Sequence, residues 1–268
     1  MTTTRQPLRE AGMFWYQTTV GPAHVGFTNR GAGNLALHVG DDHEAVRRRR
    51  AALESQLGVQ PGSMLYLNQV HGNTVADAEQ LAAGVVPTAD AAVSTTGRPL
   101  AVMVADCVPV VLVGQDPGDP RVCVTAVAHA GRNGFLDGVL EATVDAMRTR
   151  AAVRIYAVVG PSVCGDCYEV PEQMAADSEL RSPGVRAETS WGTPSLDLPG
   201  AAVRRLQEMG VDVDRPQDQP TVACTLENTT LFSHRRDAGS GRIVGVVTVP
   251  EHPGANLGSD QQDGAVEL

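Results

Sequence analysis

The chain contains no lysine, because all 21 of its basic residues are arginine. It therefore has no Walker-A lysine, no Schiff-base amine and no serine–lysine dyad, and the mechanisms that depend on these groups are excluded. Any anionic ligand must be bound by arginine, by backbone N–H groups or by a metal ion. Aromatic residues make up only 4% of the chain, so we expect a core of mainly alanine, valine and leucine.

The chain also lacks the features of proteins that bind nucleic acids or membranes. Its net charge is −10, whereas nucleic acids and anionic membranes attract positive surfaces. No apolar run approaches the roughly 20 residues of a transmembrane helix, and the first ten residues are polar and unlike a secretory signal. The five cysteines are an odd number. We expect a reduced, cytoplasmic protein whose cysteines and histidines serve chemistry more than disulfide bonding.

The 268 residues contain no internal repeat and no long linker, which favours a single domain. We place this domain at residues 13–249, after a polar N-terminal segment at residues 1–12. Residues 250–268 are rich in Gly, Pro, Asp and Gln and are expected to form a disordered tail. A chain of this length can bury a full hydrophobic core without disulfide bonds.

Short runs rich in valine and isoleucine, ending at Gly, Pro, Asp or Asn, predict strands. Apolar residues at helical spacing predict helices. Several predicted strands are apolar on both faces, so they belong to a sheet that is covered on both sides. The predicted fold class is therefore a layered α/β domain. The predicted strands are Met64–His71, Leu100–Val104, Val108–Val113, Arg121–His129, Val153–Val159, Thr221–Thr225 and Ile243–Val249, and the predicted helices are Glu44–Leu57, Phe135–Met147 and Pro199–Met209.

Three short motifs lie at the end of a predicted strand or just after it, and each contains a residue that commonly binds metal ions. His71 lies in NQVHG, Cys107 in ADCVP and His129 in AHAG. Loops beyond strand ends are where α/β proteins usually build their sites. Two histidines and one cysteine suit Zn²⁺, with a fourth position open for water or substrate. We hypothesise a shared zinc site, against the alternative of structural histidines and a buried thiol, since the spacing matches no short metal motif.

Alternation along the strands restricts which other residues can join this site. Cys123 shares a face with His129 but lies about 20 Å away along the strand, so we expect it to be a buried thiol. Asp106 and Cys107 point in opposite directions in a regular strand. A carboxylate ligand at Asp106 would therefore require a bulge.

Two further motifs have less specific interpretations. Cys164 and Cys167 form a single CxxC motif, for which we expect a structural or incidental role. Arg235 or Arg236 can clamp an anion with two parallel hydrogen bonds. A surface ion-pair cluster with Asp237 is the equally supported alternative.

The motifs, in this order, resemble the YfiH-like laccase-domain family, whose members are often named polyphenol oxidases and are better described as purine nucleoside phosphorylases. The resemblance covers nearly the whole core. It implies a single α/β domain with two packed mixed β-sheets flanked by helices, and a zinc ion bound by His71, Cys107 and His129. The matching stretches are NLALHVGDD, NQVHG, ADCVPVVL, AHAG, GPSVCGDCYEV and CT…LFSHRRDAGSGR.

The resemblance also implies an activity. It implies phosphorolysis of adenosine, inosine, guanosine and methylthioadenosine to a base and a pentose 1-phosphate, with adenosine deamination as a further activity. An active-site arginine of the family falls on Arg30, which we expect to orient phosphate together with Arg132. Gln69 is expected to contact substrate, and Glu169 and Gln69 are candidates for the group that handles the proton. The expected partners are a small nucleoside and phosphate.

The chain departs from the family where family members usually read HAGWRG. Here the segment 129–134 reads HAGRNG, so Arg132 takes the tryptophan position and Asn133 the arginine position. The three expected metal ligands are intact. The sequence therefore supports metal binding more directly than it supports a substrate range.

Three alternatives belong to other classes of protein. A copper polyphenol oxidase needs many histidines, often as His-x-His pairs, but the chain has seven histidines and no such pair. A thiol hydrolase would use Cys107 as the nucleophile and His129 or His71 as the base. A non-catalytic zinc-binding module would retain the metal and convert no nucleoside.

Overall fold

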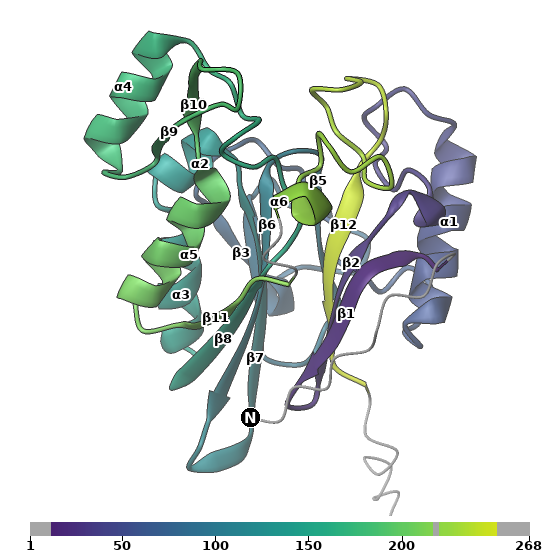
Figure 1. Ribbon diagram of the computed structural model, residues 1–268. Helices are drawn as coiled ribbons and strands as arrows, with labels where there is room; N and C mark the ends of the chain where they lie inside the picture. The colour runs from purple at the N-terminus through teal and green to yellow at the C-terminus, as the bar shows by residue number, and fades with distance from the viewer. Residues whose placement is uncertain (1–11, 217–219, 251–268) are drawn as a thin grey trace, which may run out of the picture.

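The computed structural model describes residues 12–216 and 220–250. The N-terminal segment expected at 1–12 and the tail expected at 250–268 therefore lie almost entirely outside the described residues. Two sheets pack face to face, with helices on the outer sides, as Figure 1 shows. This arrangement confirms the expected fold class.

The larger sheet has six strands and is mixed. Its parallel pairs are the two outermost ones, and the inner pairs are antiparallel. In order across the sheet, the strands are β11 (Asp212–Asp214), β8 (Arg154–Val159), β6 (Val108–Asp116), β7 (Asp119–Ala130), β4 (Ala91–Ser94) and β3 (Val75–Asp77).

The smaller sheet has four strands, which pair antiparallel. A parallel bridge between Leu65 and Leu100 adds to its edge and makes this sheet mixed as well. A separate hairpin pairs β9 (Arg186–Glu188) with β10 (Pro194–Leu196). In order across the smaller sheet, the strands are β1 (Phe14–Val20), β2 (Ala23–Thr28), β12 (Ile243–Thr248) and β5 (Leu100–Val104).

Alternation along the central strands divides the core into layers. Val110 and Leu112 of β6 pack toward the helices, whereas Val111 and Val113 belong to the cluster shared by the two sheets. Phe27 of β2 is fully buried in that shared cluster. Both faces of β6 are therefore buried, which explains why its sequence is a continuous apolar run.

Helices cover both outer sides of the two sheets. Residues of α3 and α5 pack on the larger sheet, and α1 packs on the smaller sheet on the opposite side of the molecule (Figure 1). Among the described residues, no helix combines the length and apolar character required to cross a membrane. The helices are α1 (His43–Gln56), α2 (Arg132–Leu136), α3 (Val139–Arg148), α4 (Glu172–Arg181), α5 (Leu198–Glu208) and α6 (Pro220–Ala223), with 3₁₀ turns η1 (Arg30–Ala32) and η2 (Ala78–Gln80).

Three of the predicted elements are wrong. Met64–His71 is an extended segment with isolated bridges instead of a strand. Thr221–Thr225 is the end of α6 and the residues after it, because an apolar run of five residues does not distinguish a strand from a helix. The predicted helix Phe135–Met147 is two helices, since Gly138 adopts a left-handed conformation (φ 88°) between α2 and α3.

The contact between the sheets depends on a close approach at Gly160, the residue after β8. A Cβ atom at this position would lie 2.2 Å from Cε1 of Phe27. We predict that Gly160→Ala lowers the free energy of unfolding by about 1–3 kcal/mol, because the fully buried ring has no space to shift. Urea unfolding measures this value. Gly239→Ala is the control, since its Cβ would have its nearest neighbour at 3.7 Å, and an equal effect in both variants would contradict the prediction.

Candidate functional site

The three residues selected from the strand ends lie together. His71 comes from the segment after the Asn68 bridge, Cys107 from the turn between β5 and β6, and His129 from the end of β7. One ligand atom from each lies within 4.8 Å of the others. The Cys107 Sγ atom is 3.8 Å from His71 Nε2, and the two imidazole rings meet edge to face with centroids 4.7 Å apart. His71 is exposed, Cys107 is half-buried and His129 is buried.

A buried carboxylate, Asp90, holds two of these residues in place. Its Oδ1 atom is 2.8 Å from Nδ1 of His129, which leaves Nε2 of that ring to face Cys107. The same carboxylate accepts hydrogen bonds from the backbone N–H groups of Val70, His71 and Gly72. Asp90 thereby fixes both the His129 ring and the loop that carries His71. The sequence analysis did not identify it.

Asp90, His129 and Cys107 shift one another's pKa values. Burial disfavours the charged form of all three, but their mutual contacts outweigh it. Contacts with Asp90 and Cys107 raise the pKa of His129 to about 9. Hydrogen bonds with His129 and His71 lower the pKa of the Cys107 thiol to about 6. The sulfur is therefore stabilised as a thiolate, the form that attacks electrophiles and binds metals.

The backbone is strained at two points beside the ligands. His71 and Asp106 have positive φ values of 61° and 83°, which non-glycine residues rarely adopt. The Asp106 carboxylate accepts hydrogen bonds from the Thr225 hydroxyl (2.6 Å) and from the backbone N–H of Arg235 (2.8 Å). Asp106 therefore braces the turn and lies outside the group that can hold a metal.

The glycine of the AHAG motif makes room for the cluster. A Cβ atom at Gly131 would lie 2.6 Å from Cδ2 of His71 and 3.3 Å from Sγ of Cys107. Any side chain at this position would push His71 out of its place. Packing therefore requires glycine at position 131 of the AHAG motif, and the motif's histidine, His129, is required for the cluster itself.

A cleft of about 230 Å³ opens at the three residues. Gln69 lines it, but both ends of its amide are bonded to the backbone of Met103, at 2.7 and 2.8 Å. Two residues that the sequence analysis did not select, His38 and Arg242, also line the cleft. The complete lining is His38, Gln69, His71, Met103, Val104, Ala105, Cys107, His129, His234 and Arg242.

The other predicted site residues lie outside this lining. The Arg30 guanidinium lies 5.0 Å from the ring centre of Phe232. Arg132 donates to the Ser178 hydroxyl at 3.3 Å. The Glu169 carboxylate is exposed and accepts a hydrogen bond from the Trp191 indole at 2.8 Å.

The two anion-clamp candidates have different surroundings. The Arg236 guanidinium donates to backbone carbonyls, including those of Thr225, Leu226 and Leu231, so it holds a loop together. Arg235 stacks over the Tyr168 ring, with its guanidinium carbon 4.4 Å from the ring centre. Of the two arginines, Arg235 is thus the better candidate for binding an anion, and its guanidinium lies against the Tyr168 ring.

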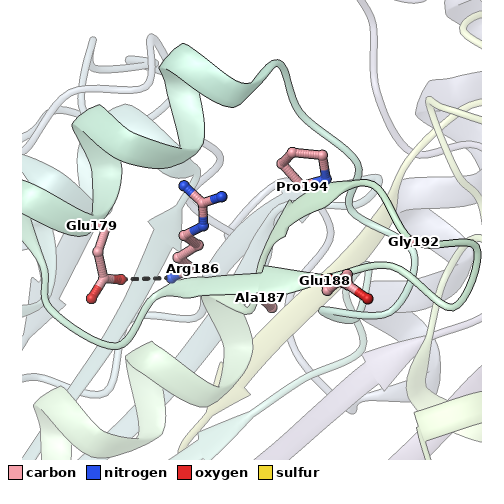
Figure 2. Close-up of a pocket in the computed structure, with 6 residues that line it drawn as sticks. All are labelled: Glu179, Arg186, Ala187, Glu188, Gly192 and Pro194. Atoms are coloured by element: carbon pink, nitrogen blue, oxygen red, sulfur yellow. Dashed lines mark hydrogen bonds between the residues drawn. The ribbon is translucent and has the colours of Figure 1, made fainter.

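A larger hollow, of about 610 Å³, lies between α4 and the β9–β10 hairpin. Figure 2 shows Glu179 accepting a hydrogen bond from the backbone N–H of Arg186 there. Arg186 also pairs with Glu172. The residues that line this larger hollow include no imidazole or thiol. The smaller cleft at His71, Cys107 and His129 is therefore the better candidate for catalysis.

The donor set of the cleft fits zinc. Zinc binds imidazole nitrogen at about 2.0–2.1 Å and thiolate sulfur at about 2.3 Å. Ligands around one ion are then separated by roughly the 3.8 Å seen between His71 and Cys107. The hydrogen bond from His129 to a carboxylate is the usual support of a metal-binding histidine.

The family model described as multi-copper polyphenol oxidoreductase laccase matches residues 21–250. The chain belongs to this family, which confirms the resemblance drawn from its motifs. A purine nucleoside phosphorylase of Streptomyces coelicolor is 43% identical over 248 residues, covering 88% of this chain and 99% of the relative. One from Corynebacterium glutamicum is 38% identical, covering 86% and 96%.

Solved structures have the same fold. A Neisseria meningitidis protein matches with a TM-score of 0.73 and 32% identity, covering 86% of this chain and 96% of its own. YlmD from Geobacillus stearothermophilus matches with a TM-score of 0.73 and 28% identity, covering 91% and 98%. The similarity extends over nearly the full length of both proteins.

The position of Asp90 generates a prediction about metal affinity. We expect Asp90→Asn to weaken zinc binding at the cleft about 10–100-fold, because the amide cannot accept all the N–H groups that the carboxylate accepts. Competition with a chromophoric chelator measures the affinity. Asp116→Asn, at the end of β6, is the matched control. Unchanged affinity in Asp90→Asn would show that the carboxylate does not position the ligands.

Proposed function

We propose that the protein is a zinc-dependent purine nucleoside phosphorylase that uses His71, Cys107 and His129 to bind the metal. The observation that carries the proposal is the convergence of these three side chains, which share no local sequence, beside a cleft in a chain whose relatives are named purine nucleoside phosphorylases. Because the chain has no lysine, a small anionic co-substrate would be bound by arginine, by backbone N–H groups or by the metal ion.

In phosphorolysis, a phosphate oxygen forms a bond to the sugar carbon C1′ while the bond from C1′ to the purine breaks. Positive charge develops on the sugar, and the purine leaves with its electron pair and takes up a proton. A bound zinc ion would supply Lewis-acid chemistry in the cleft. The residues of the chain must hold phosphate on one side of the sugar and provide the proton on the other.

Arg242 is suited to the phosphate. Its guanidinium lines the cleft, and burial lowers its pKa while the Cys107 and Asp106 charges oppose that change. His38 lies in the same lining, and burial, together with Arg242 and Arg50, lowers its pKa. A histidine kept in the neutral form is a poor proton donor, so His38 does not supply the proton that the purine takes up. Glu169 and Gln69 stay the proposed candidates for proton handling.

The proposed substrates are adenosine, inosine, guanosine and methylthioadenosine, each with phosphate. Adenosine deamination is proposed as a further activity at the same site, where a zinc ion held by His71, Cys107 and His129 would supply the activation of water that this reaction requires. Arg30 and Arg132 stay proposed phosphate contacts on the basis of the family resemblance. The proposed location of the protein is the cytoplasm.

A thiol hydrolase is the second candidate, and one geometric observation favours it. Cys107, His129 and Asp90 form a hydrogen-bonded series of nucleophile, base and carboxylate. Such an enzyme would keep its activity after chelation and lose it on alkylation of Cys107. The proposed phosphorylase would lose its activity on chelation and recover it with zinc.

The family description points to a copper oxidase, and the cleft lining includes Met103 together with His71, His129 and Cys107. That set of side chains is found at copper sites that transfer electrons. Metal analysis of protein purified without added copper, with dioxygen uptake in the presence of a phenol, separates this activity from phosphorolysis. Zinc and no oxygen uptake are the results expected here.

The main prediction is phosphate-dependent turnover. Purified protein mixed with adenosine and phosphate should release adenine, and omission of phosphate should stop the release. Cys107→Ala should abolish the reaction, because it removes a proposed ligand, whereas Cys123→Ala should retain it. Chromatography of the bases measures both. Equal turnover by Cys107→Ala, or adenine released without phosphate, would exclude the mechanism.

A further prediction concerns the arginine that binds phosphate. Arg242→Gln should raise the KM for phosphate by about tenfold or more, as loss of a charge-assisted hydrogen bond does, and should leave the metal content unchanged. Steady-state kinetics with varied phosphate measure this value. Arg48→Gln, on the exposed side of α1, is the control. If Arg30→Gln raises the KM and Arg242→Gln does not, Arg30 is the phosphate residue.

A further inference from the structure

The structure gathers a second set of metal-binding side chains outside the cleft. Cys164 and Cys167 lie in the loop after β8, and Cys224 and Glu227 follow α6. One ligand atom from each of the four lies within 4.8 Å of the others. The three cysteines are buried and the glutamate is exposed. The CxxC motif is thus completed by residues nearly 60 positions further along the chain.

Main-chain hydrogen bonds bring these residues together. The N–H groups of Cys167 and Tyr168 both donate to the carbonyl of Cys164, which folds the CxxC motif into a turn. Ser162 bridges to Cys224, which places the third thiol against that turn. A further turn closes when Asn228 N–H donates to the Cys224 carbonyl, and this turn brings Glu227 back toward the thiols.

The glutamate distinguishes this group from a purely apolar cluster of thiols. The three cysteines pack with Val163, and an oxygen of the Glu227 carboxylate lies within 4.8 Å of the three sulfur atoms. Three sulfur atoms and one carboxylate oxygen at such separations are a donor set that zinc binds in proteins.

We propose that Cys164, Cys167, Cys224 and Glu227 bind a second zinc ion with a structural role. Three thiolates and one carboxylate complete a tetrahedral set, so no position is left open for substrate. Sulfur atoms at about 2.3 Å from one ion lie about 3.8 Å from each other, which agrees with the spacing of the group. The ion would join the loop after β8 to the segment after α6.

This position gives the ion a function in supporting the cleft. Val163, next to Cys164, donates a backbone hydrogen bond to the carbonyl of Asp106, and Thr225, next to Cys224, donates its hydroxyl to the Asp106 carboxylate. Asp106 directly precedes Cys107. The second ion would therefore stabilise the two segments that hold the strained turn of the cleft.

The test counts metal ions at each site separately. Protein expressed with zinc and passed through metal-free buffer is analysed by mass spectrometry of the elements. We expect two zinc ions for the natural chain, one for His71→Ala/Cys107→Ser, one for Cys164→Ser/Cys167→Ser and none for the combined variant. Cys123→Ser, which changes a half-buried cysteine outside both groups, should keep two.

The variant His71→Ala/Cys107→Ser leaves the second set intact, so the test does not depend on folding of the cysteine variants. Replacing its remaining zinc with cobalt should produce ultraviolet sulfur-to-metal absorption from several thiolates. A metal-free His71→Ala/Cys107→Ser protein would overturn the proposal. So would an intact mass lower by two hydrogens, because it would show a disulfide among these cysteines. If only the cleft proposal fails, Cys164→Ser/Cys167→Ser still loses one ion.

Discussion

The candidate site depends on the hydrogen bonds that the Asp90 carboxylate accepts. A buried carboxylate is costly unless donors surround it, and here the donors are the His129 ring and three consecutive backbone N–H groups at residues 70–72. The backbone of Asp90 also accepts from His129 N–H at 2.7 Å. Asp90, the residue before β4, therefore links the end of β7 to the segment that carries His71. This link and the hydrogen bonds of the Gln69 amide to Met103 hold His71 near Cys107.

The support of Cys107 has a different origin. Its turn adopts a left-handed backbone at Asp106, which costs about 1–3 kcal/mol. The Asp106 carboxylate offsets that cost through Thr225 and Arg235, and the Gln69 amide ties the neighbouring β5 backbone. The three side chains of the cleft are thus held in place by residues outside the group that could bind a metal. Changes to those residues should alter metal affinity before they alter the fold.

The sequence predicts the parts of the structure that depend on local pattern. β5 begins and ends as predicted, and β6, β7, β8, β12, α1 and α5 lie within a few residues of their predicted bounds, because long apolar runs and helical spacing are local signals. His71, Cys107 and His129 were selected because strand ends are common sites. Asp90 and Asp106 were not assigned these roles, since their partners lie 39 and 119 positions away. A CxxC motif likewise gives no sign that Cys224 completes it.

The donor set of the cleft does not by itself decide between electron transfer and group transfer, since two histidines and a cysteine occur in both kinds of site. The remaining lining favours group transfer. An electron-transfer site needs an apolar shell and a route to a second redox centre, whereas Arg242, His38 and His234 line this cleft. In a chain of net charge −10 without lysine, a half-buried arginine beside the histidines and the cysteine is suited to binding an anion. Phosphate is the anion that the proposed reaction consumes, so the same arginine that disfavours an oxidase explains why a phosphorylase fits.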